Sequence, residues 1–132
     1  MKSIVEKVIE FHQTILGTPQ ATSIAELNNA NFELLVRQLD EELLELQAGW
    51  EDTNIVNQVD ALVDLIYFAL GGLYKKGLSA KQIEHVFGLV HDANMTKSIG
   101  KVAKRYVEGT IDAVKPTDFR GPELAIKEYL NV

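Results

Sequence analysis

The sequence predicts an all-α fold, a bundle of four to five helices forming one domain over residues 1–132. Apolar residues recur at helical spacing in four successive stretches, and these stretches are separated by glycines and by polar residues that cap helices. The apolar fraction of 46% and the charged fraction of 24% are ordinary for a globular chain. A chain of this length can bury one hydrophobic core.

The first two helices are predicted from Lys2 to Leu16 and from Phe32 to Gly49. In the first helix the apolar residues lie on one side, and the glycine and proline that follow are expected to end it. The polar segment 18–31 is interpreted as a connection containing at most a short helical turn. In the second, leucines and valines resume the helical period until Gly49, which is expected to end the helix.

Two further long helices follow. The third is expected to start at the cap residues 52–54 and to run to Gly77, and its apolar content indicates burial on several sides. The fourth starts at a capping box formed by Ser79 and Gln82 and is expected to continue towards Lys97. A last short helix is predicted over residues 122–130, with a proline at its start.

Composition narrows the function classes. The formal net charge of −6 disfavours binding to long nucleic acids. There is no cysteine, so disulfides and thiolate chemistry are excluded and a reducing compartment fits. The N-terminus lacks the pattern of a signal peptide, and the apolar stretch 59–74 is short for a membrane span and is interpreted as a buried helix. A cytoplasmic location is therefore expected.

Two carboxylate pairs lie in apolar stretches. Glu42 and Glu45 are three residues apart, and Asp60 and Asp64 are four apart, so each pair lies on one helical face. None of the four has a Lys, Arg or His three or four residues away, whereas the neighbouring Glu41 has Arg37 at pairing distance. Buried carboxylates without partners are costly, and a hard divalent cation such as Mg²⁺ neutralises them. The alternative is a solvated helix face.

Phosphate-binding candidates follow the carboxylates. His91, Asn94 and Lys97 are spaced by three, so a continuing helix would place them near one face that suits a phosphate. The alternative for Asn94 is a helix cap. Basic residues at 101, 104 and 105 can neutralise a polyphosphate, although lysines after a helix also stabilise its C-terminus. Trp50 can stack on a nucleobase or pack at a helix edge.

The motifs together resemble the MazG-like all-α nucleoside triphosphate pyrophosphohydrolases, which are related to phosphoribosyl-ATP pyrophosphohydrolase. The resemblance rests on Arg37 followed by residues 41–45, on residues 59–67 with Gly71, and on residues 90–97. It implies Mg²⁺ bound by the second and third glutamates of the EExxE motif and by an acidic pair on the next helix. The residues at these positions are Glu42, Glu45 and Asp64. The sequence departs from the family at Ala61, where glutamate is common, and Asp60 is the candidate substitute.

The resemblance further implies cleavage between the α- and β-phosphates, giving a nucleoside monophosphate and pyrophosphate, in a homodimer or homotetramer whose central helices complete the core. The leading hypothesis is therefore a Mg²⁺-dependent nucleotide pyrophosphohydrolase, with Mn²⁺ as the alternative ion. Glu42, Glu45, Asp60 and Asp64 are the expected metal ligands, and Glu41 is expected to orient or deprotonate the attacking water. Asn94, Lys97 and Lys101 are expected to bind the phosphates, with Lys97 also stabilising the leaving group.

Two rival hypotheses remain open. A helical assembly or regulatory module would bind a nucleotide without turning it over, which the departure at Ala61 favours. A purely structural bundle would bind no metal.

Overall fold

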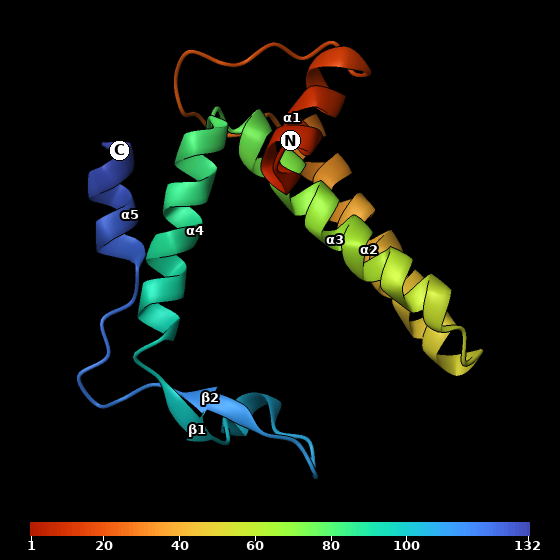
Figure 1. Ribbon diagram of the computed structural model, residues 1–132, viewed down its shortest axis with the longest axis vertical. Coiled ribbons are helices and arrows are strands. Elements are labelled where there is room, and N and C mark those ends of the chain that lie inside the picture. Colours follow the sequence, from red (N-terminus) through yellow and green to blue (C-terminus); the bar gives the residue numbers. More distant parts are fainter. The chain divides into compact units, whose positions relative to one another are not determined.

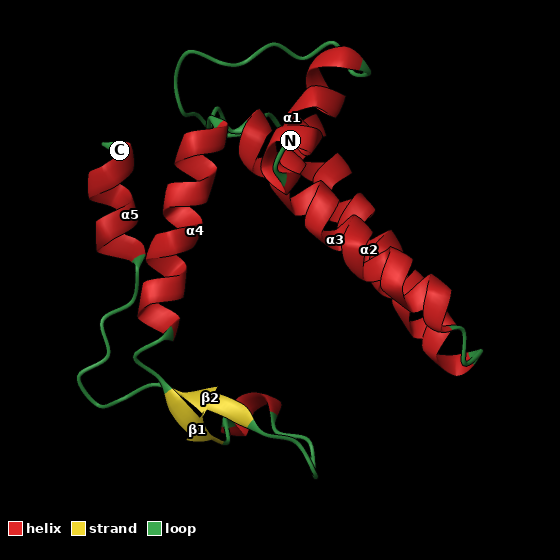
Figure 2. Cartoon of the chain, in the orientation of Figure 1, coloured by secondary structure: helices red, strands yellow, loops and turns green.

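The computed structural model describes all residues 1–132 and contains five helices and two short strands (Figures 1 and 2). The predicted all-α class is confirmed. The chain divides into two compact units, Met1–Ile83 and Glu84–Val132, with the boundary inside the fourth helix. The interpretation of residues 1–132 as one domain stays a prediction.

The first unit begins with α1, Ile4–Thr14, which is shorter than predicted at both ends. Ser3 caps it through a capping box with Glu6, in which each side chain accepts a hydrogen bond from the other's backbone N–H. The connection that follows contains no helix. α2, Asn29–Glu51, starts earlier than predicted because the Asn28 side chain caps it by accepting from the Asn31 N–H.

α2 and α3 pair along much of their lengths (Figure 1). α3 spans Ile55–Lys75, is capped by Asn54 as predicted, and also packs against α1. The prediction that Gly49 ends α2 was wrong, because Gly49 is buried inside the helix. A Cβ there would lie 3.1 Å from Cγ of Gln58 and 3.4 Å from the carbonyl oxygen of Asn54. The glycine therefore permits a close approach of the two helices and does not terminate one.

The apolar surface of α3 is largely exposed in the single chain. The expected burial on several sides is not reached, since α3 exposes a row of branched apolar residues: Val56, Val59, Leu62, Val63 and Ile66. α2 likewise exposes apolar side chains: Phe32, Leu43, Leu44 and Trp50. By length and composition alone α3 could cross a membrane, but the core helices of soluble proteins meet the same criterion. An unpartnered apolar surface of this extent is typical of an interaction surface.

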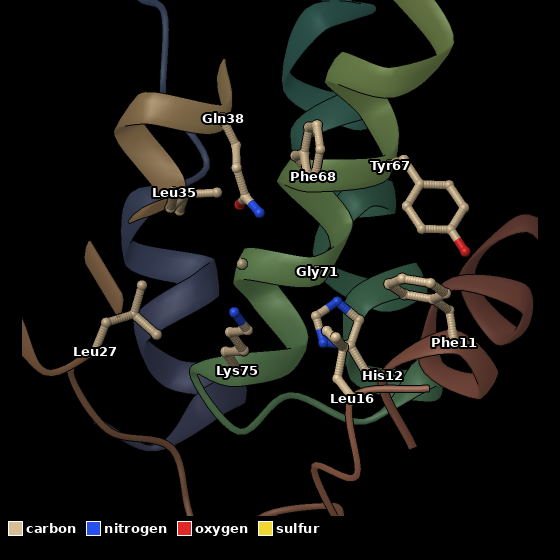
Figure 3. Close-up of a pocket in the computed structure, with 11 residues that line it drawn as sticks. Phe11, His12, Leu16, Leu27, Leu35, Gln38, Tyr67, Phe68, Gly71 and Lys75 are labelled. Atoms are coloured by element: carbon tan, nitrogen blue, oxygen red, sulfur yellow. The ribbon is translucent and has the colours of Figure 1, made fainter. Parts of the chain in front are cut away.

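A small cavity of about 40 Å³ lies among α1, α2 and α3 (Figure 3). His12 lies against Gly71, where any Cβ would collide with the imidazole ring. Burial, together with the charge of Lys75, lowers the pKa of His12. Nearby, the buried Tyr74 hydroxyl donates to the carbonyl oxygen of Thr18 at 2.8 Å. These contacts give His12 a packing role between α1 and α3.

The predicted capping box at the start of the fourth helix is confirmed. α4 spans Ala80–Asn94, with Ser79 and Gln82 exchanging hydrogen bonds at its N-terminus. Its predicted continuation to Lys97 was wrong. The helix ends three residues earlier, where the Thr96 hydroxyl donates to the carbonyl oxygen of Ala93.

A small hairpin that the sequence did not predict follows α4. β1, Ser98–Gly100, pairs antiparallel with β2, Asp112–Val114, and the loop between them contains one 3-10 turn, η1, Ala103–Arg105. Three-residue strands are too short to show an alternating pattern. The predicted last helix is confirmed as α5, Glu123–Leu130. Within this unit the rings of Tyr129 and His85 stack with centroids 3.8 Å apart.

Candidate metal centre

Three of the four predicted metal ligands lie together in the first unit. Glu42 and Glu45 come from α2 and Asp64 comes from α3, and one oxygen of each lies within 4.8 Å of the others. Spacing within each helix places the carboxylates on one face, and the pairing of α2 with α3 turns these two faces towards each other. The cluster is thus a product of both sequence spacing and tertiary contact.

The cluster carries unbalanced negative charge. Glu42 is only 6% exposed, and its Oε2 atom is buried without a hydrogen-bond partner. Burial raises the pKa of Glu42 to about 7, helped by a hydrogen bond with Glu45 and by the charges of Glu45, Asp64 and Glu41. The pKa of Asp64 is also raised, by burial and then by the charges of Asp60 and Glu45. No Lys or Arg forms an ion pair with any of these carboxylates.

This donor set fits a hard divalent cation. All the donors are carboxylate oxygens, which Mg²⁺ and Mn²⁺ prefer, and an ion would give the orphaned Oε2 of Glu42 a partner.

The fourth predicted ligand, Asp60, is not part of this cluster. Its side chain is exposed and lines a neighbouring cavity of about 340 Å³ together with Glu45, Asp52 and Asn57. The adjacent Ala61 is completely buried. Asp60 therefore affects the cluster through its charge on Asp64, while Glu45 belongs to both the cluster and the cavity.

The surface pair that the spacing of Arg37 and Glu41 allows does not form. Arg37 instead forms an ion pair with Glu33, one helical turn in the other direction, at 2.7 Å. Glu41 is exposed beside Glu42 and has no cationic partner. Its carboxylate is accordingly free to act on a ligand or on solvent.

The predicted phosphate-binding residues lie in the second unit. Asn94 is the last residue of α4, so the expected continuous helical face joining it to His91 and Lys97 was wrong. The Lys97 ammonium lies over the Phe119 ring at 5.6 Å, and the Lys101 ammonium lies over the Tyr106 ring at 4.7 Å. Both lysines line one cavity.

Sequence reasoning missed another cation of this cavity, Lys115. The hairpin brings it next to Lys97 although the two are far apart in the chain, and no local spacing signals such a contact. Trp50 is 74% exposed near the end of α2, so its packing as a helix-edge residue does not bury it.

The chain matches the model of a known protein family. The model of the phosphoribosyl-ATP pyrophosphohydrolase family matches residues 8–94, about two thirds of the chain. The matched region contains all the candidate carboxylates and Asn94, and it ends before Lys97 and Lys101. No curated protein matches the chain.

Proposed function

The chain belongs to the phosphoribosyl-ATP pyrophosphohydrolase family, and we propose that it hydrolyses a nucleoside triphosphate or a related nucleotide between its α- and β-phosphates. The products would be the nucleoside monophosphate and pyrophosphate. The observation that carries the proposal is the buried Glu42 carboxylate, whose Oε2 has no hydrogen-bond partner and which lies beside Glu45 and Asp64. Such a charge is costly unless a cation accompanies it. A site that gathers carboxylates around a bound cation suits the binding of phosphates.

The carboxylates have distinct proposed roles. Glu42, Glu45 and Asp64 would hold Mg²⁺, or Mn²⁺ as the alternative, and Asp60 would contribute from the adjoining cavity. When bound, the ion supplies Lewis acidity to phosphate oxygens and lowers the pKa of a coordinated water. Glu41, exposed and without a cationic partner, would orient that water or accept its proton.

The phosphate contacts are proposed on the chemistry of the side chains in the second unit. Asn94 can donate hydrogen bonds through its amide, and Lys97 and Lys101 supply positive charge for phosphate oxygens. Lys97 would stabilise the negative charge that develops on the pyrophosphate leaving group. No covalent intermediate is required, because water is the nucleophile.

Product analysis tests the proposal. The protein is incubated with a panel of nucleoside triphosphates and Mg²⁺, and the expected products are a monophosphate and pyrophosphate, with no turnover in EDTA. Glu42→Gln and Glu45→Gln should abolish turnover, whereas Glu51→Gln, which alters an exposed glutamate at the end of the same helix, should not. Release of orthophosphate, or full activity in Glu42→Gln, would refute the mechanism.

One observation favours a second candidate, a nucleotide-binding module without turnover. Ala61 occupies the position of a common family glutamate. Its side chain is a completely buried methyl group, which offers no metal ligand at that point of α3. This reading predicts that calorimetry detects nucleotide binding in Mg²⁺ while no product forms during long incubation. Slow turnover with the expected products would reject it.

The exposed apolar surface of α2 and α3 supports self-association. We expect a homodimer or homotetramer, since a second copy could cover the exposed residues of α3 that a single chain leaves in water. Light scattering coupled to size exclusion measures the mass directly. A monomer at micromolar concentration would contradict this expectation without affecting the proposed chemistry.

A further inference from the structure

The second unit contains a cavity of about 490 Å³ that basic residues dominate. It lies between the start of the hairpin, the η1 turn and the end of β2. The remaining lining is small and apolar, with no carboxylate. Five of its nine lining residues are cations: Lys97, Lys101, Lys104, Arg105 and Lys115.

The positive charge of this cavity is largely uncompensated. None of its four lysines forms an ion pair, and the only carboxylate bound to a lining cation is Asp112, on Arg105. Residues 97–105 contain four cations and no acid. This concentration is local, because the whole chain carries a net charge of −6. Like charges gathered in one cavity repel each other unless an anion joins them.

The dipole of α4 does not explain the positions of most of these lysines. A cation stabilises a helix C-terminus only within about the last turn. α4 ends at Asn94, and Lys97 is the nearest lining residue, three positions beyond it. Lys104 lies in the η1 turn and Lys115 follows β2, so neither position is explained by the dipole of α4.

Aromatic rings position several of the cations. The ammonium groups of Lys97 and Lys115 lie 5.6 Å and 5.2 Å from the centre of the same Phe119 ring, and Lys101 lies 4.7 Å from that of Tyr106. Cation–π contacts of this kind restrain the side chain but consume none of the ammonium hydrogen-bond donors. The lysines are thus held in place with their donors available.

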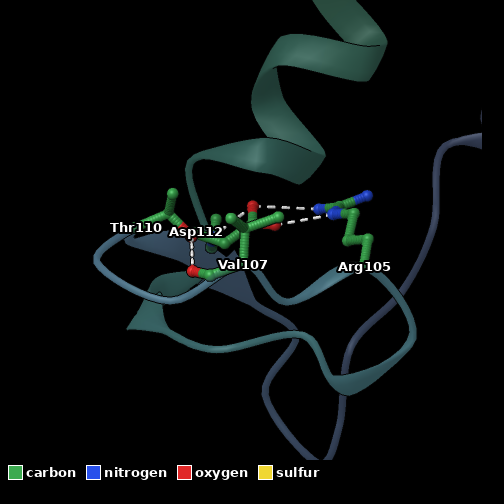
Figure 4. A network of polar contacts seen from close by, with 5 residues as sticks. Arg105, Val107, Thr110 and Asp112 are labelled. Atoms are coloured by element: carbon green, nitrogen blue, oxygen red, sulfur yellow. Dashed lines mark hydrogen bonds and ion pairs between the residues drawn. The ribbon is translucent and has the colours of Figure 1, made fainter.

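The loop that carries the cations is tied to the hairpin (Figure 4). The Arg105 guanidinium donates to both carboxylate oxygens of Asp112 in β2, at 2.6 Å and 2.9 Å. Within the same loop the Thr110 hydroxyl donates to the carbonyl oxygen of Val107. At the start of the loop a Cβ on Gly100 would overlap the Val114 side chain, so the strands meet closely there. The cavity therefore has a defined scaffold.

We propose that this cavity is a metal-independent binding site for an oligophosphate, meaning two or more linked phosphate groups. An oligophosphate presents several negative charges in a compact volume, and lysine ammonium groups bind phosphate oxygens through charge-assisted hydrogen bonds. A volume of about 490 Å³ is in the range of small-molecule sites. A long nucleic acid fits less well, because it would also meet the acidic remainder of the chain. Lys97 and Lys101 are also the proposed phosphate contacts of the hydrolysed nucleotide, so this inference rests on the proposed function and extends those contacts to Lys104, Arg105 and Lys115.

Calorimetric titration of the full chain with inorganic pyrophosphate in EDTA tests the site. We expect saturable binding that weakens with added salt. The double variant Lys104→Met/Lys115→Met, which keeps the aliphatic stems, should weaken binding at least about tenfold, equivalent to about 1.4 kcal/mol. Lys104→Met alone changes an exposed residue with no ion pair or cation–π partner, and it should weaken pyrophosphate binding several-fold. This single variant replaces the double variant if the latter does not fold. Lys127→Met, on exposed α5 and outside the cavity, is the matched control and should bind normally.

Further ligands distinguish the source of the oligophosphate. Equal affinity for pyrophosphate and a nucleoside triphosphate would assign the site to the phosphate chain alone, and a nucleoside monophosphate should bind much more weakly than either. Glu42→Gln should leave binding in EDTA unchanged, so loss of hydrolysis and loss of this site are separate results. The inference is overturned if pyrophosphate does not bind in EDTA, if the lysine variants bind as well as the parent, or if a single-stranded oligonucleotide binds more tightly.

Discussion

Glu42→Gln should stabilise the metal-free protein at alkaline pH and not at acidic pH. The folded state raises the pKa of Glu42 from 4.5 to about 7, so between these values it holds a proton that the unfolded chain has released. The unfolding free energy of the parent therefore falls as pH rises through this window. At about 1.4 kcal/mol per pKa unit the loss is at most about 3 kcal/mol. Glutamine carries no charge at any pH, so the variant does not lose this unfolding free energy.

The assay is thermal unfolding in EDTA at pH 5 and pH 8. For a chain of this length about 1 kcal/mol shifts Tm by roughly 3 to 4 °C, so the variant should gain up to roughly 10 °C over the parent at pH 8 and little at pH 5. Glu41→Gln is the matched control, because it removes an exposed charge from the adjacent position. It should change Tm much less.

Added Mg²⁺ should reverse the order of stability. A ligand that binds only the folded state at about 1,000 times its Kd adds about 4.1 kcal/mol, which exceeds the loss at alkaline pH, and this gain should appear in the parent and shrink in Glu42→Gln. An equal Tm difference between parent and variant at both pH values in EDTA would refute the reasoning about burial. Equal stabilisation of both proteins by Mg²⁺ would refute the assignment of Glu42 as a ligand.

Four further substitutions test the helix packing and the exposed side of α3. Gly49→Val should lower the unfolding free energy by roughly 1–3 kcal/mol, because the added side chain overlaps Gln58. Gly88→Ala, at a helical glycine with open space around it, should raise the unfolding free energy by about 0.5–1 kcal/mol. Urea unfolding followed by circular dichroism measures both. Tyr74→Phe should cost about 1–2 kcal/mol in the same assay, because it leaves the part-buried carbonyl of Thr18 without its donor. Ile66→Asp, on the exposed side of α3, should shift light scattering towards the monomer mass, and an unchanged oligomer would exclude this side from the interface.

The helices were largely predictable because their signals are local. Ser79 with Gln82, and Asn54 before the third helix, are capping patterns that the sequence displays and the structure contains. Gly49 shows where local reasoning fails. A glycine after a helical stretch resembles a stop, but at this position the close approach of α3 is what a side chain would obstruct. The hairpin was missed because its pairing joins residues more than ten positions apart.

The candidate metal site was likewise predictable only where its residues are close together in the chain. Helical spacing alone paired Glu42 with Glu45 and Asp60 with Asp64, since residues three or four apart share a face. Spacing could not choose between the two aspartates. The contact of α2 with α3 groups Asp64 with the two glutamates and leaves Asp60 exposed at the neighbouring cavity.

The sequence by itself determined the helical class, the capped starts of α3 and α4, and the residue types that suit a metal and phosphates, because periodicity and capping act within one or two turns. Only the tertiary structure decided which carboxylates meet, how strongly Glu42 is buried, and that Lys97 and Lys115 lie over one aromatic ring. The physical reason is that burial and electrostatic coupling depend on distances in space. Residues far apart in the chain become neighbours only when the helices and strands pack.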